Sequence, residues 1–332
     1  MRSLPRISCV LVVMFAAAIC APNPVPAQQA VPGGTPANAP AQLPQLADGV
    51  VYSISPSDAD PRVQRFTASN LALFRHDVPR NAPLLVYFSG TGGTPMTGWL
   101  FLEAGAKAGY RVIGLEYDNA SSVPGICEKK PDETCSDRFR QKRVFGDDVT
   151  KDIDDLPAES IVNRLTKLLQ YLDEHHRADG WGRYLRKGQP DWSRIAFAGH
   201  SQGGGMAAFI AKKKRVARVI VISGAADRVE TTKGFAPWVA SKSATPMNRW
   251  YAAYHAKESR AAALKSAASI LRIPAEHVRV LSLEPNPQIA RPPNVDVYHG
   301  SMVSAQSTPR DSAGNPAYAG DWAFMLGQAG SR

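Results

Sequence analysis

Residues 194–205 read RIAFAGHSQGGG, an apolar run that leads into a serine between two glycines. Apolar runs without polar alternation are typical of strands buried on both faces of a sheet. Residues 202–214 continue as a helical stretch. The sequence therefore predicts a strand, a tight turn at Ser201 and a helix. Gly199 and Gly203 allow the strained backbone that such a turn needs.

A serine in a G-x-S-x-G turn after a strand is a candidate nucleophile, because the turn projects its hydroxyl from the edge of the sheet. His200 belongs to the same turn, and we assign it to the turn rather than to catalysis. The amide of Gln202, at the start of the helix, would point at the oxyanion that develops when the serine attacks a carbonyl group. An ordinary serine in a glycine-rich turn is the alternative.

A second oxyanion donor is predicted upstream, where the apolar run 84–88 ends in the small residues SGTGG. Small side chains after a strand let a backbone amide come close to a substrate oxygen. We expect the amide of Thr91 to be this donor, with Gly92 as the next choice. A plain structural turn remains the alternative for this segment.

Apolar runs that are typical of strands alternate with helical patterns along the chain. The expected strands are 50–53, 71–74, 84–88, 111–115, 194–198, 218–222, 249–255 and 278–283. The clearest helix is 158–175, with a start near Asp155 and Pro157. This alternation predicts a mostly parallel, twisted α/β sheet flanked by helices. Together with the turn at Ser201 it indicates an α/β-hydrolase fold, without a large lid domain.

A serine at neutral pH needs a base and an acid that orients the base. In this fold the chain order is serine, acid, histidine. His299 follows the last expected strand and fits that order, whereas His255 ends a strand and could line the site.

The acid is expected after the second strand that follows the serine, where Glu258 is the only carboxylate of the segment AKES. A solvated carboxylate at a helix start is the alternative for Glu258. Asp227, after the first strand, is the runner-up for the acid. Asp296 is third, because it is close in sequence to His299.

The first 27 residues are expected to be a cleaved signal peptide. Two arginines precede an apolar stretch of 14 residues, 7–20, and small residues lead to a cleavage site near Ala27. The stretch is shorter than the about 18 residues that a membrane-spanning helix needs. Residues 28–47 predict a flexible linker, and 48–332 the catalytic domain. We therefore expect an exported product, periplasmic or extracellular, with no stable membrane anchor.

The formal net charge is +10, but the one dense basic run, 212–215, falls where a helix should end, and no nucleic-acid motif accompanies it. We therefore expect no nucleic-acid partner.

Cys127 and Cys135 remain after signal removal, and an even pair in an exported protein indicates a disulfide. They lie in the connection 118–156, which should cover the site. No residues stand at metal-ligand spacing, and no cofactor is expected.

The stretch from Asp155 to Gly205 resembles an uncharacterised branch of exported bacterial α/β-hydrolases. The resemblance extends to the segment of the two cysteines and to a C-terminal tryptophan, Trp322. The GHSQG turn is also similar to that of lipases and cutinase-like polyester hydrolases. These resemblances imply a carboxylic-ester hydrolase (EC 3.1.1 type) acting on a small-molecule or polymeric ester. A peptidase or amidase with the same triad, or a binding protein on a degenerate hydrolase fold, are the alternatives.

Overall fold

A computed structural model describes residues 43–287 and 295–327. The predicted signal peptide and the predicted linker up to residue 42 lie outside the described residues. Within the described part of the chain, no helix is both long and apolar enough to cross a membrane.

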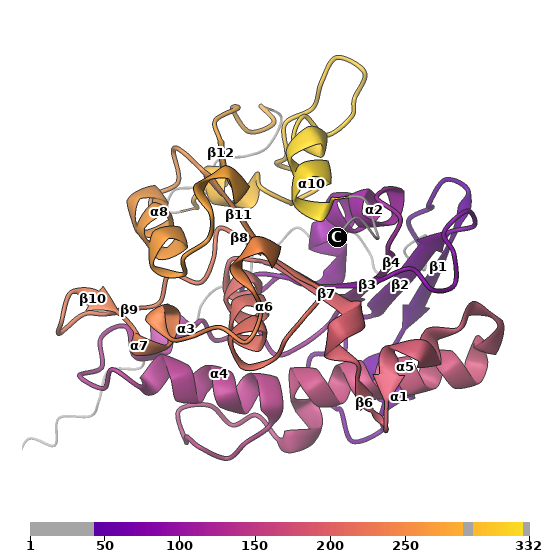
Figure 1. Cartoon of the computed structure of the whole chain (residues 1–332), viewed down its shortest axis with the longest axis horizontal. Coiled ribbons are helices and arrows are strands. Elements are labelled where there is room, and N and C mark those ends of the chain that lie inside the picture. Colours follow the sequence, from indigo (N-terminus) through magenta and orange to yellow (C-terminus); the bar gives the residue numbers. More distant parts are fainter. Residues whose placement is uncertain (1–42, 288–294, 328–332) are drawn as a thin grey trace, which may run out of the picture. The chain divides into compact units, whose positions relative to one another are not determined.

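The main sheet has eight strands in the order β1-β2-β4-β3-β7-β8-β11-β12 (Figure 1). The pairs β1–β2 and β2–β4 are antiparallel, and every other pair is parallel. The strands are β1 (Gly49–Ile54), β2 (Asn70–Arg75), β3 (Leu84–Phe88), β4 (Arg111–Leu115), β7 (Ile195–His200), β8 (Arg218–Ile222), β11 (Trp250–His255) and β12 (Val278–Leu281). Two small hairpins add β5 (Leu185–Arg186) with β6 (Gln189–Pro190), and β9 (Arg228–Val229) with β10 (Gly234–Phe235).

The predicted strands agree with this sheet, three of them to the residue. β7 begins one residue later than expected and runs on to His200, because that residue still pairs with Ile222 of β8. β12 ends at Leu281 rather than at Leu283, whose carbonyl instead accepts a hydrogen bond from the His255 ring. All residues of β3, β4 and β7 are buried, as their mostly apolar sequences predict, and this includes Arg111 at the start of β4 and His200 at the end of β7.

Helices cover both faces of the sheet (Figure 1). Buried side chains of α4, α5 and α6 pack on one face, and those of α2 and α10 on the other. The helices are α1 (Pro56–Ala59), α2 (Trp99–Lys107), α3 (Val123–Cys127), α4 (Cys135–Phe145), α5 (Ile161–His175), α6 (Gln202–Lys213), α7 (Pro237–Ala240), α8 (Ala261–Ile270), α9 (Val297–Gly300) and α10 (Ala319–Leu326).

The predicted start of the long helix is wrong by several residues. Residues Pro157–Glu159 form a separate 3₁₀ turn, and α5 begins only at Ile161. Ser160 is the N-cap, since its Oγ accepts a hydrogen bond from the Asn163 amide at 3.3 Å. Ser160 competes as a cap with Asp155, whose carboxylate instead forms a buried ion pair with Arg143.

The parallel strands β3, β7, β8 and β11 all end at one edge of the sheet, so the segments that follow them meet there. Three non-glycine residues at this edge have positive φ angles: Ser201 at 54°, Ser223 at 49° and Ala225 at 59°. Such conformations are costly for residues with a Cβ atom and concentrate at functional sites. We therefore expect the functional site at this edge of the sheet.

Candidate active site

The turn between β7 and α6 holds Ser201 in an unusual conformation, with φ 54° and ψ −120°. A Cβ atom on Gly199 would lie 2.2 Å from the backbone of Gly203. A Cβ atom on Gly203 would lie 2.2 Å from the carbonyl oxygen of Phe88 in β3. Both glycines are thus required by close approach of the backbone, and the Ser201 amide fixes the turn by donating to Ile222 O at 2.8 Å.

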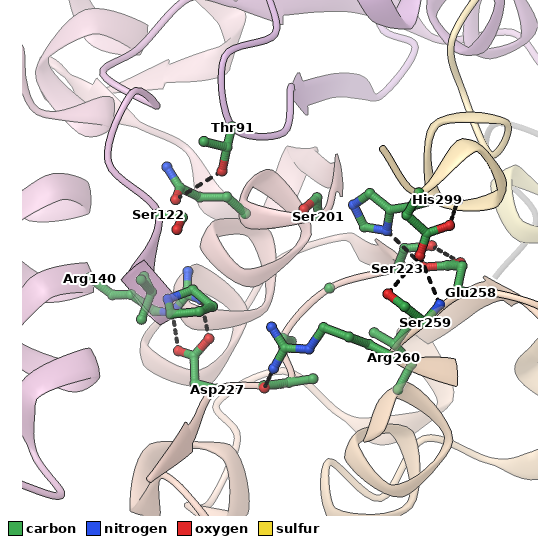
Figure 2. Close-up of a pocket in the computed structure, with 18 residues that line it drawn as sticks. Thr91, Ser122, Arg140, Ser201, Ser223, Asp227, Glu258, Ser259, Arg260 and His299 are labelled. Atoms are coloured by element: carbon green, nitrogen blue, oxygen red, sulfur yellow. Dashed lines mark hydrogen bonds and ion pairs between the residues drawn. The ribbon is translucent and has the colours of Figure 1, made fainter. Parts of the chain in front are cut away.

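A pocket of about 340 Å³ opens beside this turn (Figure 2). Its walls come from the turn, from the segments after β3, β8 and β11, from the connection between β4 and α4, and from α9. The sequence-predicted site residues that line it are Ser201, Gln202, Thr91, Glu258, Asp227, Asp296 and His299. His255 does not line it: its ring is fully buried and bonded to backbone groups of Leu283 and Lys257.

His299 and Glu258 are directly bonded, with 2.7 Å between His299 Nδ1 and Glu258 Oε2. The Glu258 side chain is 1% exposed, against 31% for His299. Glu258 Oε1 accepts two more hydrogen bonds, from Ser223 Oγ at 2.6 Å and from the His255 amide at 2.7 Å. In the view of Figure 2 the His299 ring lies between Ser201 and Glu258. The buried carboxylate is thereby fixed against one nitrogen of the ring.

The backbone of His299 is held from two sides. Its amide donates to Asp296 Oδ1 at 3.1 Å, and Asp296 Oδ2 accepts from both the amide and the hydroxyl of Ser259 at 2.8 Å. Its carbonyl accepts from His200 Nε2 at 2.9 Å. Asp296 therefore links the histidine segment to the segment of Glu258, and His200 links it to the turn of Ser201.

The His200 ring is buried, and burial, with His299 nearby, holds its pKa well below its usual value. The ring is therefore neutral, and the carbonyl acceptor requires that Nε2 carries its proton. Sequence reasoning assigned His200 to the turn alone and Asp296 to third place among the acids. The structure gives both a positioning contact with His299 that chain order could not indicate.

Asp227 lines the pocket but is bonded elsewhere. Its two oxygens accept from Arg140 Nε and Nη2, each at 2.7 Å, and Oδ2 also accepts from Trp238 Nε1 at 2.9 Å. Both partners of the ion pair are nearly inaccessible, with Arg140 2% and Asp227 5% exposed. The carboxylate bonded to the His299 ring is therefore Glu258, and Asp227 is the partner of a buried arginine.

The two predicted sources of an oxyanion hole lie close to each other in the pocket. Thr91 and Gln202 both line the pocket, and their side chains approach each other at 3.5 Å. The Gly92 amide, by contrast, donates to Asn119 O at 3.3 Å, so it is already engaged. Asn119 Nδ2 also donates to Gly93 O at 2.6 Å. Asn119 thus braces the segment after β3, a role for which the sequence carried no signal.

The connection between β4 and α5 covers the pocket, as predicted. Val123 and Pro124 of α3 and Arg140 of α4 line it. The structure pairs Cys127, at the end of α3, with Cys135, at the start of α4, with 5.5 Å between their Cα atoms. The pairing fastens together the two helices that form this wall.

Three carboxylates elsewhere could in principle hold a cation: Asp118, Asp154 and Asp155. Arg143 pairs with Asp118 at 3.2 Å and with Asp155 at 2.8 Å, and Arg65 pairs with Asp154 at 2.9 Å. Burial raises the pKa of Asp118 to about 6. Because arginines already neutralise this cluster, it is an ion-pair network within the fold.

No family model matches the chain, and no curated protein matches it. Solved structures similar to it include Bacterial Heroin Esterase, with 13% identity over 86% of each chain and a TM-score of 0.43. A thermostable esterase from Pseudomonas putida ECU1011 is 14% identical over 87% of this chain and 86% of its own, with a TM-score of 0.41. A hyperthermophilic esterase from Pyrobaculum calidifontis is 15% identical over 70% of this chain and 75% of its own, with a TM-score of 0.36.

These similarities are low, so the assignment of the fold rests on the chain's own topology. Two antiparallel strands precede a run of parallel ones, and a strained serine stands between β7 and α6. A buried carboxylate, Glu258, and then a histidine, His299, follow this serine along the chain. This is the order serine, acid, histidine that is typical of the fold. By strand order, helix placement and the turn at Ser201, the chain has the α/β-hydrolase fold.

Proposed function

We propose that this protein is a serine hydrolase of carboxylic esters, with Ser201 as nucleophile, His299 as base and Glu258 as acid. One observation carries the proposal: the His299 ring is bonded to the buried Glu258 carboxylate in the same pocket as the strained Ser201. A histidine oriented by a carboxylate beside a serine on a tight turn is the arrangement that makes a hydroxyl nucleophilic.

In the proposed mechanism Ser201 Oγ attacks the ester carbonyl while His299 Nε2 takes the hydroxyl proton. Glu258 keeps the other ring proton on Nδ1 and stabilises the imidazolium that forms. The amides of Gln202 and Thr91 donate to the oxyanion. His299 then protonates the leaving alcohol, and a water molecule, activated by the same ring, hydrolyses the acyl-enzyme.

A fluorophosphonate probe tests this proposal against its alternatives. We expect one covalent adduct, located on Ser201 by peptide mass spectrometry, and turnover of p-nitrophenyl esters from acetate to palmitate that exceeds turnover of matched peptide amides. Faster cleavage of the amides would make the protein an amidase or peptidase. The absence of both adduct and turnover would make it a binding protein on a hydrolase fold.

We further propose that the chain is exported and that Cys127 and Cys135 form a disulfide in the mature protein. The short loop that they close is worth about 2.5 kcal/mol of unfolding free energy in the chain-entropy model. The bond joins two helices of the pocket wall. Reduction should therefore disturb substrate binding, measured as a rise in KM for an ester, more than it disturbs the stability of the whole fold, measured as a fall in melting temperature.

Mass spectrometry after alkylation checks the bond directly. Natively exported protein should take up no alkylating reagent until it is reduced, and then two equivalents. The double variant Cys127→Ser/Cys135→Ser should take up none in either state. Two reactive thiols in unreduced exported protein would contradict the proposal.

A further inference from the structure

Arg260 brings a positive charge into the pocket. It follows Glu258 by two residues and is the N-cap residue of α8. In Figure 2 its guanidinium extends across the pocket, between Asp227 and the side where Ser201 and His299 lie. The side chain is 40% exposed. A ligand in the pocket would therefore meet this group directly.

The contacts of Arg260 leave most of its hydrogen-bonding capacity unused. Among the described residues, Nη2 donates to Ala226 O at 3.1 Å, and the nearest carboxylate oxygen, Glu128 Oε1, is 3.8 Å away. A guanidinium carries five N–H donors in a planar fork. Arg140, the other arginine of the pocket, is by contrast bonded through two nitrogens to Asp227. Arg260 can thus receive an anion, whereas Arg140 cannot.

The carboxylates of the pocket restrict where an anion can lie. Asp227 is neutralised by Arg140, and Glu258 is bonded to His299. Among residues 43–287 and 295–327, no cationic side chain is bonded to Asp296; its oxygens accept from Ser259 and from the His299 amide. Its negative charge would repel an anion near His299. The favourable position is therefore beside Arg260 Nε and Nη1, which have no acceptor among the described residues, because Nη2 already faces Ala226 O and Glu128 Oε1.

We propose that Arg260 binds a free carboxylate of the substrate, so that the preferred substrates are half-esters of short dicarboxylic acids. Two parallel N–H donors match a carboxylate in geometry, and such charge-assisted bonds are about twice as strong as neutral ones. The nearby walls contributed by Leu264, Val123 and Ala226 are apolar and suit the methylene chain between the two carboxyl groups. The inference rests on the proposed ester hydrolysis for its substrate, but its binding part can be measured without turnover.

The test compares monomethyl glutarate with the methyl ester of glutaramic acid, which has nearly the same shape and no charge. We expect the wild-type kcat/KM to be at least about tenfold higher for the acid, mainly through KM. In Arg260→Gln the ratio should fall to about 1, and Arg260→Lys should retain part of it, because lysine keeps the charge but not the fork. Monomethyl succinate and adipate then give the chain length that fits best.

Arg279→Gln is the matched control. Arg279 is similarly half-exposed, with one carboxylate oxygen at 3.6 Å and one backbone acceptor at 3.3 Å, but it does not line the pocket. Its replacement should leave the ratio as in wild type. Equal kcat/KM for acid and amide in wild type, or a ratio that falls equally in both variants, would overturn the proposal.

Binding to Ser201→Ala separates this inference from the proposed function. Calorimetry should show that monomethyl glutarate binds to Ser201→Ala at least about tenfold more tightly than the uncharged methyl ester of glutaramic acid, and that Ser201→Ala/Arg260→Gln loses the difference. If no ester is cleaved but this difference appears, the carboxylate site stands and the esterase proposal fails. If esters are cleaved and monomethyl glutarate binds no better than the uncharged ester, the esterase proposal stands and the carboxylate site fails.

Discussion

Replacement of Ser201 by alanine should lower kcat for p-nitrophenyl butyrate by a factor of about 10³ or more. The loss follows from the removal of the only atom that forms the acyl-enzyme in the proposed mechanism. The backbone should tolerate the change, because alanine has the same Cβ atom and the strained φ of 54° is already accommodated by the surrounding glycines. The measurement is kcat under saturating substrate, together with circular dichroism and a thermal melt.

Ser266→Ala is the control for this experiment. Ser266 is an exposed serine of α8 whose hydroxyl donates to Ala262 O within the same helix. It should retain wild-type kcat. If a folded Ser201→Ala variant keeps a tenth of the wild-type rate, Ser201 is not the nucleophile.

Glu258→Gln should lower kcat by a factor of about 10² to 10⁴ with little change in KM. An amide in this place cannot stabilise the imidazolium, and its NH₂ group can force the wrong tautomer on His299. Glutamine keeps the length of the side chain, so the acceptor for Ser223 Oγ and the His255 amide can be retained. A steady-state assay on protein whose folded fraction is known from its melt gives kcat per folded molecule.

Asp227→Asn should behave in the opposite way. It removes the negative charge that balances Arg140 in a buried ion pair, and a buried charge left without its partner costs about 3–5 kcal/mol of unfolding free energy. The melting temperature should fall, while kcat per folded molecule stays near wild type. If instead Asp227→Asn loses kcat a hundredfold and Glu258→Gln does not, Asp227 is the acid.

The sheet could be predicted from the sequence because local pattern and tertiary burial agree in it. The run at 84–88 is apolar throughout and is buried throughout. The sequence does not predict the start of α5, because both Asp155 and Ser160 are residue types that can cap a helix. Asp155 forms an ion pair with Arg143 instead, and Ser160 is the cap. The ion pair is a tertiary contact with α4, so the local sequence around Asp155 cannot show that this residue is not the N-cap.

The same distinction holds in the pocket. Glu258 can be predicted by counting strands, because in this fold the position of the acid follows from topology. The contact of His200 with the His299 carbonyl spans 99 residues and depends on tertiary packing, whereas Asp296 is the N-cap of α9 and contacts the His299 amide locally, over three residues. Arg260 carried no sequence signal of its own, since an arginine two residues past a predicted acid is usually a solvated charge.

The buried arginine that engages Asp227 also bears on how this chain can evolve. A Cβ atom on Gly205 would lie 2.3 Å from Arg140 Nη2. The absence of a side chain at this third glycine after the serine therefore leaves the space that the guanidinium from α4 occupies. A change at either position alone would disturb the other residues. Alanine at 205 would displace the arginine, and loss of the arginine would leave the buried carboxylate of Asp227 without its ion-pair partner. Across a lineage of such chains, Arg140, Gly205 and Asp227 should therefore be inherited or replaced as a set, and a homologue with alanine at 205 should carry neither the arginine nor the aspartate.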